Sequence, residues 1–176
     1  MVSPSRSDPL RLPLKKFKSY VDSLKPGRIN LRNKNGQTLL AEAAWWGYPD
    51  KVRILIEFGA DPDIKDKNGN TALSGFHLNK KNRLTIVKIL IDAGADVNLS
   101  GWRGTTPLMK ALDDGDVKVT DVLLRAGADI RKKNSIGMTV LESAEAHLLL
   151  NKIFGEEKTG ISRIEMLAII KMLKKK

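Results

Sequence analysis

The tripeptide Gly-x-Thr recurs four times along this 176-residue chain at a nearly constant spacing. Its glycines are 33, 35 and 33 residues apart, at Gly36, Gly69, Gly104 and Gly137. A Gly-Ala-Asp tripeptide begins ten residues before each of the last three, at Gly59, Gly94 and Gly127. Two markers in one phase over four periods indicate a supersecondary unit stacked on itself. The chain is therefore expected to be a repeat protein that presents a surface.

Elementary helix chemistry explains the two markers. Each threonine can cap a short helix, because its hydroxyl accepts backbone N–H groups that otherwise lack a partner. Apolar stripes typical of a second helix follow, at Val52, Ile54, Leu55 and Ile56; Val87, Ile89, Leu90 and Ile91; and Val119, Val122, Leu123 and Leu124. Each stripe ends at the glycine of a Gly-Ala-Asp tripeptide, where a left-handed residue closes a helix. Such a unit cannot bury its apolar face alone, so that its neighbours must stack.

The openings of the first helices read Thr38-Leu39-Leu40-Ala41, Thr71-Ala72-Leu73-Ser74, Thr106-Pro107-Leu108-Met109 and Thr139-Val140-Leu141-Glu142. They resemble the T-P-L-H-x-A signature of the ankyrin repeat family, although only the third keeps the proline and none keeps the histidine. The resemblance covers residues 26–147. It implies an all-α fold, an α-solenoid of ankyrin-like repeats in which a β-turn precedes two antiparallel helices.

Transferred to the whole chain, the repeat frame predicts six segments. They are a mobile tail at 1–9, an N-terminal cap formed by a degenerate repeat at 10–32, and four repeats at 33–65, 66–100, 101–133 and 134–176. In the cap, Leu14, Phe17, Val21 and Leu24 follow helical spacing. The fourth repeat is expected to contain an irregular loop at 151–160 and a C-terminal capping helix.

That capping helix is predicted to open at Ser162 with a capping box to Glu165. It would place Ile164, Leu167 and Ile170 or Lys171 on adjacent faces. The second repeat carries a two-residue insertion between Ser74 and Lys81, in a region that includes an unusual helical glycine, Gly75. Such insertions often map to a binding face, and neutral drift in a surface turn explains this one equally well.

Composition and charge limit the class of protein. Cysteine is absent, which excludes disulfides and thiolate chemistry. The N-terminus lacks an apolar stretch typical of a secretory signal, which favours an intracellular, cytoplasmic protein; a nuclear location or export as an effector is equally compatible. Residues 1–34 carry a net charge of +7 and residues 152–176 a net charge of +4, whereas the stretch between them is neutral. The basic ends either keep terminal units soluble or contact nucleic acid, anionic lipid or an acidic protein.

The sequence offers no constellation that would carry catalysis. His77 and His147 are far apart, and no phosphate loop or metal-ligand spacing appears, so that no enzyme activity, no metal, no cofactor and no small-molecule substrate is expected. The run from Asp113 to Asp116 lacks the ligand pattern of a calcium loop and fits a solvated turn between helices. Asn98 resembles the asparagines that are hydroxylated in some eukaryotic ankyrin proteins, but an unmodified hairpin asparagine is the preferred interpretation.

The resemblance implies where a partner protein would bind, on hairpin tips, first-helix ends and the concave face. The partner-binding residues predicted in this way are Trp45, Trp46, Lys67, Asn68, His77, Leu78, Asn79, Trp102, Arg103, Asp113 and Asp114. Tryptophan and arginine are enriched in binding hot spots. Alternatively, one of Trp45 and Trp46 packs against Phe17 or Tyr20 of the N-terminal cap.

The sequence thus predicts a monomeric, non-catalytic module that binds or masks another protein. One alternative is a microbial or viral effector or inhibitor, including an immunity-type protein that blocks a host or toxin enzyme. An alternative of another class is a regulator that associates with nucleic acid or an anionic membrane through its basic ends.

Overall fold

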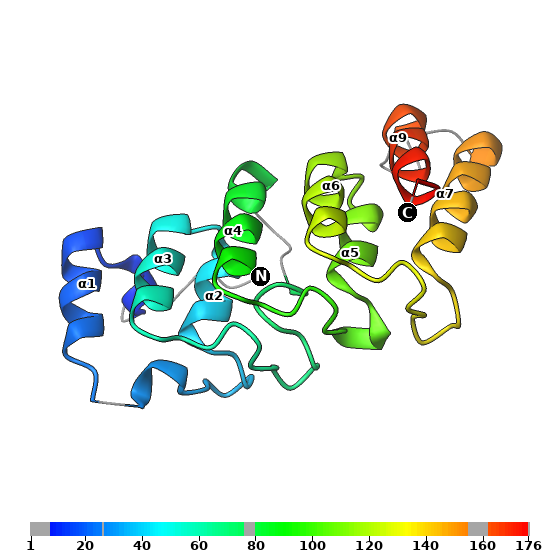
Figure 1. Ribbon diagram of the computed structural model, residues 1–176. Helices are drawn as coiled ribbons and strands as arrows, with labels where there is room; N and C mark the ends of the chain where they lie inside the picture. The colour runs from blue at the N-terminus through cyan, green and yellow to red at the C-terminus, as the bar shows by residue number, and fades with distance from the viewer. Residues whose placement is uncertain (1–7, 26, 76–79, 155–161, 176) are drawn as a thin grey trace. The chain divides into compact units, whose positions relative to one another are not determined.

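A computed structural model describes residues 8–25, 27–75, 80–154 and 162–175 (Figure 1). The elements are η1 (Pro9–Arg11), α1 (Leu14–Asp22), η2 (Arg28–Asn30), α2 (Leu39–Trp46), α3 (Pro49–Glu57), α4 (Lys80–Asp92), η3 (Trp102–Gly104), α5 (Pro107–Asp113), α6 (Val117–Arg125), α7 (Val140–Phe154) and α9 (Arg163–Leu173). The described residues contain no strand, and their isolated β-bridges join Arg32 to Thr38 and Lys133 to Thr139. The predicted all-α fold is confirmed.

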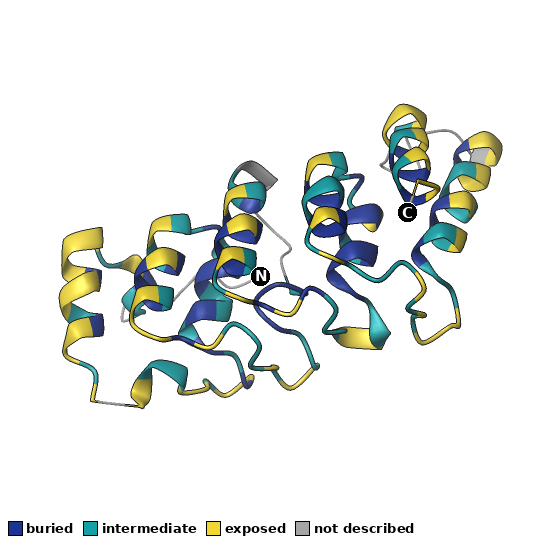
Figure 2. Cartoon of the chain, in the orientation of Figure 1, coloured by how far each residue is buried: buried dark blue, intermediate teal, exposed yellow. Residues whose placement is uncertain are grey.

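The chain forms two compact units, Met1–Ala95 and Asp96–Lys176, called here the first and second unit. In the first unit, α2 packs on α3, and α3 also contacts α1 and α4. In the second unit, α5 contacts α6 and α7, and α9 packs against α7 and α6. The buried sides of neighbouring helices therefore face one another within each unit (Figure 2).

The first helices begin at the threonines of the Gly-x-Thr tripeptides. Thr38 Oγ1 accepts the N–H of Ala41, and Thr106 Oγ1 accepts that of Met109, each at 3.2 Å. Thr139 and Glu142 form a reciprocal cap at the start of α7, in which Glu142 Oε2 accepts the Thr139 N–H at 2.7 Å. The predicted capping role of these threonines is confirmed.

The second helices end at the glycines of the Gly-Ala-Asp tripeptides. Gly59, Gly94 and Gly127 have φ angles of 80°, 86° and 88°. The N–H of the following alanine donates to a leucine carbonyl five residues earlier at 2.9 to 3.0 Å, in the pairs Ala60–Leu55, Ala95–Leu90 and Ala128–Leu123. This arrangement satisfies carbonyl groups at the helix end, as the sequence predicted.

The first helix predicted for the second repeat is absent from residues 71–75, which form a single turn. Thr71 and Ser74 cap each other, because each backbone N–H donates to the other hydroxyl, at 2.8 and 3.1 Å. Gly75 then donates to the Thr71 carbonyl at 3.0 Å, the bond of one helical turn. The prediction that Gly75 lies within a helix was therefore wrong. Residues 76–79, which belong to the region of the insertion, lie outside the described residues.

The N-terminal cap begins earlier than predicted. Residues 1–7 lie outside the described residues, but Asp8 and Pro9 are not part of a tail, because Asp8 Oδ1 accepts the Leu10 N–H at 2.8 Å and starts η1. Leu10 is buried, and its carbonyl accepts a hydrogen bond from Lys51 of α3. The Lys51 ammonium also lies 5.3 Å from the ring centre of Phe17 and 4.7 Å from that of Tyr48. Lys51 thus connects the cap to the first helix pair.

The C-terminal helices correct one prediction and show which side of α9 is buried. Residues 151–154 form the last turn of α7 instead of a loop, and the remainder of the predicted loop lies outside the described residues. α9 begins with the expected capping box between Ser162 and Glu165. Of the apolar residues predicted to line α9, Ile170 is buried, but Ile164 is 80% exposed and Leu167 is 45% exposed. Met166, Ile169 and Leu173 form the buried side with Ile170.

No helix within the described ranges is both long enough and apolar enough to cross a membrane.

Candidate functional site

The hairpin tips before the first helices are held by side-chain oxygens. Asn33, Asp66 and Asn134 each accept two backbone N–H groups through Oδ1, at 2.8 to 3.1 Å. The equivalent position of the third repeat is Gly101, which has no side chain to accept them. The tip of the third repeat therefore needs another way to close.

That tip closes as a 3-10 turn, in which the Gly101 N–H donates to Thr105 O at 2.9 Å and the Thr105 N–H to Trp102 O at 3.1 Å. Arg103 takes a left-handed conformation there, with φ of 56°, and no other non-glycine residue in the described ranges has a positive φ. Its guanidinium carbon lies 4.2 Å from the ring centre of Trp102. Because this contact directs the guanidinium over the indole, the tip presents a cation and an aromatic ring together.

Trp102 is 56% exposed, although it is one of the largest apolar side chains of the protein. The next tip in the second unit exposes another apolar side chain, Ile136, at 75%. The two tips are joined by a backbone hydrogen bond from the Ser135 N–H to Arg103 O at 2.8 Å. Ile136 was not among the residues predicted from the sequence, although an aliphatic residue at an otherwise polar tip was a signal that could have found it.

Successive tips approach each other closely at their glycines. A Cβ atom on Gly36 would lie 2.9 Å from Lys67 N, and one on Gly104 would lie 3.2 Å from Ser135 N. Both glycines also have positive φ angles, 78° and 71°. A side chain at either position would therefore be strained and would push adjacent tips apart.

The predicted site residues of the first unit are in different environments. Trp45 and Trp46, at the end of α2, are both half-buried, whereas Lys67 and Asn68 are exposed on a hairpin tip. In the N-terminal cap, Phe17 and Tyr20 contact each other with ring centres 6.5 Å apart, and α1 packs on α3. His77, Leu78 and Asn79 lie outside the described residues.

Asp113 and Asp114 at the end of α5 each lie near a basic side chain. Asp114 pairs with Lys110 at 3.3 Å, and Asp113 Oδ1 lies 3.7 Å from His147 Nε2. Burial raises the pKa of Asp113, an effect that His147 and Lys110 partly oppose. Asp116 caps α6 by accepting the Val119 N–H at 3.1 Å. Asp116 thus caps a helix and Asp114 pairs with a lysine of α5, and the described residues contain no group of side chains that could hold a metal ion.

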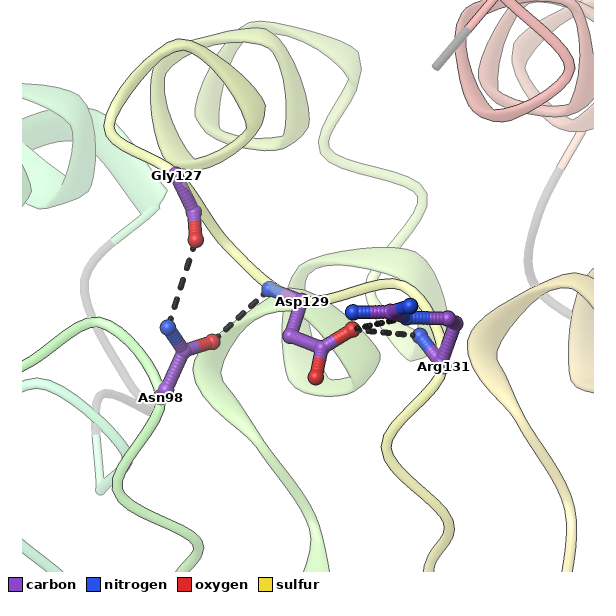
Figure 3. A network of polar contacts seen from close by, with 4 residues as sticks. All are labelled: Asn98, Gly127, Asp129 and Arg131. Atoms are coloured by element: carbon purple, nitrogen blue, oxygen red, sulfur yellow. Dashed lines mark hydrogen bonds and ion pairs between the residues drawn. The ribbon is translucent and has the colours of Figure 1, made fainter.

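Asn98 belongs to a network that joins two hairpins of the second unit (Figure 3). Its Nδ2 donates to Gly127 O at 3.2 Å, and its Oδ1 accepts the Asp129 N–H at 2.8 Å. Asp129 Oδ1 accepts in turn from the backbone and the side chain of Arg131, which lowers the pKa of Asp129. Asn30 accepts the Asp61 N–H in the same manner in the first unit, at 2.9 Å. Asn98 therefore has the structural role of a hairpin asparagine.

Glu42 is a half-buried carboxylate on α2 that lines a hollow together with Tyr20 and Arg32. Its Oε1 accepts a hydrogen bond from Asn33 Nδ2 at 2.8 Å. Burial raises the pKa of Glu42 above its ordinary value, although the bond from Asn33 opposes this change. Glu42 was not among the residues predicted from the sequence.

Comparison with known proteins agrees with the repeat architecture. A family model described as ankyrin repeats (3 copies) matches residues 15–101, 58–134 and 76–152. The chain is 32% identical over 149 residues to the B-cell lymphoma 3 protein homolog of Mus musculus, which covers 83% of the chain and 33% of that protein.

Two further relatives come from different organisms. A putative ankyrin repeat protein of Rickettsia felis is 30% identical over 121 residues, 66% of the chain and 39% of its own length. Inversin of Homo sapiens is 34% identical over 103 residues, 56% of the chain and 10% of its own length. The chain thus spans well under half the length of each of these relatives.

Proposed function

Since the chain belongs to the ankyrin repeat family, whose members generally mediate protein–protein interaction, we propose that it binds a partner protein through its hairpin tips and first-helix ends. The mechanism is steric. A preformed row of side chains holds the partner or masks part of its surface, and no covalent chemistry takes place. A blocking role, such as that of an effector or inhibitor, would use the same surface.

The observation that carries this proposal is the exposure of Trp102 on an ordered tip. An indole that is 56% exposed leaves apolar area in water, and burial of that area against a partner would be favourable. Arg103 adds a cation above the ring, and Ile136 adds aliphatic area on the neighbouring tip. Aromatic and arginine anchors with fixed geometry lose little conformational freedom on binding.

The remaining predicted residues have supporting roles in the proposal. In the first unit, the exposed Lys67 and Asn68 can make polar contacts at the edge of an interface, whereas the half-buried Trp45 and Trp46 offer part of their rings. In the second unit, Asp113 and Asp114 contribute negative charge that affects the association rate more than the final affinity.

A pull-down with the wild-type protein, followed by mass spectrometry, supplies the partner, and calorimetry then compares variants. Trp102→Ala is expected to weaken binding by about 2 kcal/mol or more. The melting temperature should change less than for a core residue, because more than half of Trp102 is already in water. Leu14→Ala, another exposed apolar residue, is the matched control and should bind normally.

The proposal for Trp102 is wrong if Trp102→Ala binds the partner with unchanged affinity. It is also wrong if the melting temperature of this variant falls sharply, since Trp102 would then stabilise the fold. For the first unit, the partner affinity and the melting temperature of Trp46→Ala distinguish in the same way between a residue that binds the partner and a residue that stabilises the fold.

A further inference from the structure

The last helix pair exposes an unusual amount of apolar surface. Ten large apolar side chains are exposed within the described residues, and five of them lie on α7 and α9. We call this set the C-terminal apolar face; it consists of Leu149, Leu150, Ile153, Ile164 and Leu167. Three of these side chains, Leu149, Ile153 and Ile164, are 57 to 80% exposed.

Helix geometry brings the five side chains to one end of the pair. Leu149, Leu150 and Ile153 have the spacing of one side of the last two turns of α7, and Ile164 and Leu167 lie one turn apart at the start of α9. The two helices pack together and run antiparallel, with Lys174 near the end of α9 paired to Glu145 of α7 at 3.2 Å. The end of α7 and the start of α9 are therefore adjacent (Figure 1).

The C-terminal apolar face is not a displaced part of the core. On the other side of the same helices, Val140, Ala144, Met166, Ile169 and Leu173 are fully or almost fully buried. The helix pair thus has a second apolar side in addition to its packed side. An apolar patch of this kind on a folded protein commonly marks an interaction site.

Charge selects the kind of partner. Lys152, Lys171 and Lys175 are exposed on this helix pair. Its acidic residues, Glu142, Glu145 and Glu165, are fewer than its exposed basic residues, and Glu145 is paired with Lys174. Among the described residues, the helix pair therefore carries more positive than negative charge, and Lys152 and Lys171 lie within one turn of the C-terminal apolar face.

We propose that the C-terminal apolar face binds an acidic amphipathic helix of a partner protein. The apolar stripe of that helix covers the five aliphatic side chains, and its carboxylates pair with the lysines at the rim. A second copy of this chain fits less well, since it would bring the same lysines against one another.

An anionic membrane also fits less well than a helix. A helix can cover the end of the pair alone, whereas the surface of an anionic bilayer would extend along the same side of α7 to Glu142 and Glu145, two turns and one turn before Leu149, and would be repelled by them.

The test uses a synthetic peptide of about 18 residues, long enough to form a helix. It carries leucine at helical spacing on one side and glutamate, glutamine and alanine elsewhere; a peptide with the same composition in scrambled order is the control. Fluorescence anisotropy measures binding to the full chain. The amphipathic peptide is expected to bind, and the scrambled peptide is not.

The variant Ile153→Ser/Leu167→Ser should raise the dissociation constant about tenfold or more, and Lys171→Glu should raise it at low salt. Both variants should fold, because the three side chains are exposed, and circular dichroism checks this. Ile136→Ser is the matched control on a hairpin tip and should bind the peptide normally. Trp102→Ala should also bind normally, which separates this surface from the proposed tip site.

The proposal is overturned if the amphipathic peptide fails to bind, if the scrambled peptide binds equally well, or if Ile153→Ser/Leu167→Ser binds like the wild type. If the protein binds no peptide but cosediments with phosphatidylserine vesicles, and Ile153→Ser/Leu167→Ser does not cosediment, the C-terminal apolar face binds a membrane. If the protein binds no peptide but self-associates, and the same variant abolishes self-association, the C-terminal apolar face binds a second copy of the chain.

Discussion

Single residues at the hairpin tips combine strain with exposure. Arg103 has a left-handed backbone conformation that costs a non-glycine residue on the order of 1 kcal/mol. Its neighbour Trp102 leaves more than half of its surface in water. Neither feature stabilises the isolated fold, so that both are better explained by an interaction than by packing.

This interpretation makes Arg103→Gly a discriminating variant. Glycine relieves the left-handed strain but removes the guanidinium from the Trp102 ring. We expect the free energy of unfolding in urea to stay unchanged or to rise by up to about 1 kcal/mol, while partner binding weakens. A clear loss of stability would show that Arg103 supports the fold. Lys34→Gly, a tip position with an exposed side chain and no positive φ, is the control and should not gain stability.

Glu42 gives the first unit a defined pH dependence. Because burial raises its pKa in the folded state above the ordinary 4.5, the folded state binds a proton that the unfolded state has already lost. The contribution of Glu42 to the free energy of unfolding therefore falls as pH rises from 4.5 through the raised pKa. Above that window both states are ionised, and the cost of burying the charge remains.

Glu42→Gln should remove this dependence. Glutamine keeps an oxygen that can accept from Asn33 but carries no charge. Urea unfolding at several pH values between 4 and 7 should show that the variant is at least as stable as wild type at neutral pH and has a flatter profile above 4.5. A variant that loses stability at neutral pH would show that the ionised carboxylate is favourable. Glu57→Gln on the exposed side of α3 is the control.

Helices begin and end here through short-range chemistry that the sequence displays. Thr106 caps α5 three residues ahead of the N–H that it accepts, and Gly94 closes α4 within the same turn. Such signals extend over a few residues, and a fixed period repeats them. This is why the fold class and most helix ends could be predicted without a structure.

Contacts over longer distances could not be predicted in this way. Lys51 joins α3 to Leu10, 41 residues earlier, and no local pattern indicates that pairing. The buried side of α9 could not be predicted either, because apolar residues occur on nearly every side of it and the period alone does not select Met166 over Ile164. In the candidate site, the exposed tip tryptophan was predicted, but the neighbouring Ile136 and the C-terminal apolar face were not.

The cap of α5 provides a test at the level of the helix. Thr106→Val preserves the shape of the side chain but removes the oxygen that accepts the Met109 N–H, and it should lower the free energy of unfolding by about 1 kcal/mol or more. Thr106→Ser keeps the oxygen and should recover most of that loss. Thermal and urea unfolding measure both variants; equal stability of valine and serine at this position would rule out a capping contribution.

At the scale of the whole molecule, charge separates the ends from the repeats. The flanks carry all of the net charge of +11, and Lys15, Lys16 and Lys18 of α1 are exposed. Basic ends attract polyanions without specificity. We therefore expect a secondary affinity for nucleic acid beside the proposed protein binding.

We expect binding to duplex DNA to be weak and to fall steeply between about 50 and 200 mM salt. Replacing Lys15, Lys16 and Lys18 by glutamate should weaken DNA binding. The same change at the exposed Lys67, Lys118 and Lys133 should weaken DNA binding less. Fluorescence anisotropy with labelled DNA measures both effects. Tight, sequence-specific binding that resists salt would instead favour a nucleic-acid regulator.

The close contact between successive tips at Gly36 and at Gly104 has an evolutionary consequence. The backbone, and not the side chains beside it, sets the step from one tip to the next within each unit, through the Lys67 N–H to Asn35 O and the Ser135 N–H to Arg103 O. Residues at the intervening positions can therefore be exchanged without altering that step. Selection can change the exposed side chains of the tips one at a time, and with them the partner that is recognised, while the spacing between the tips stays constant.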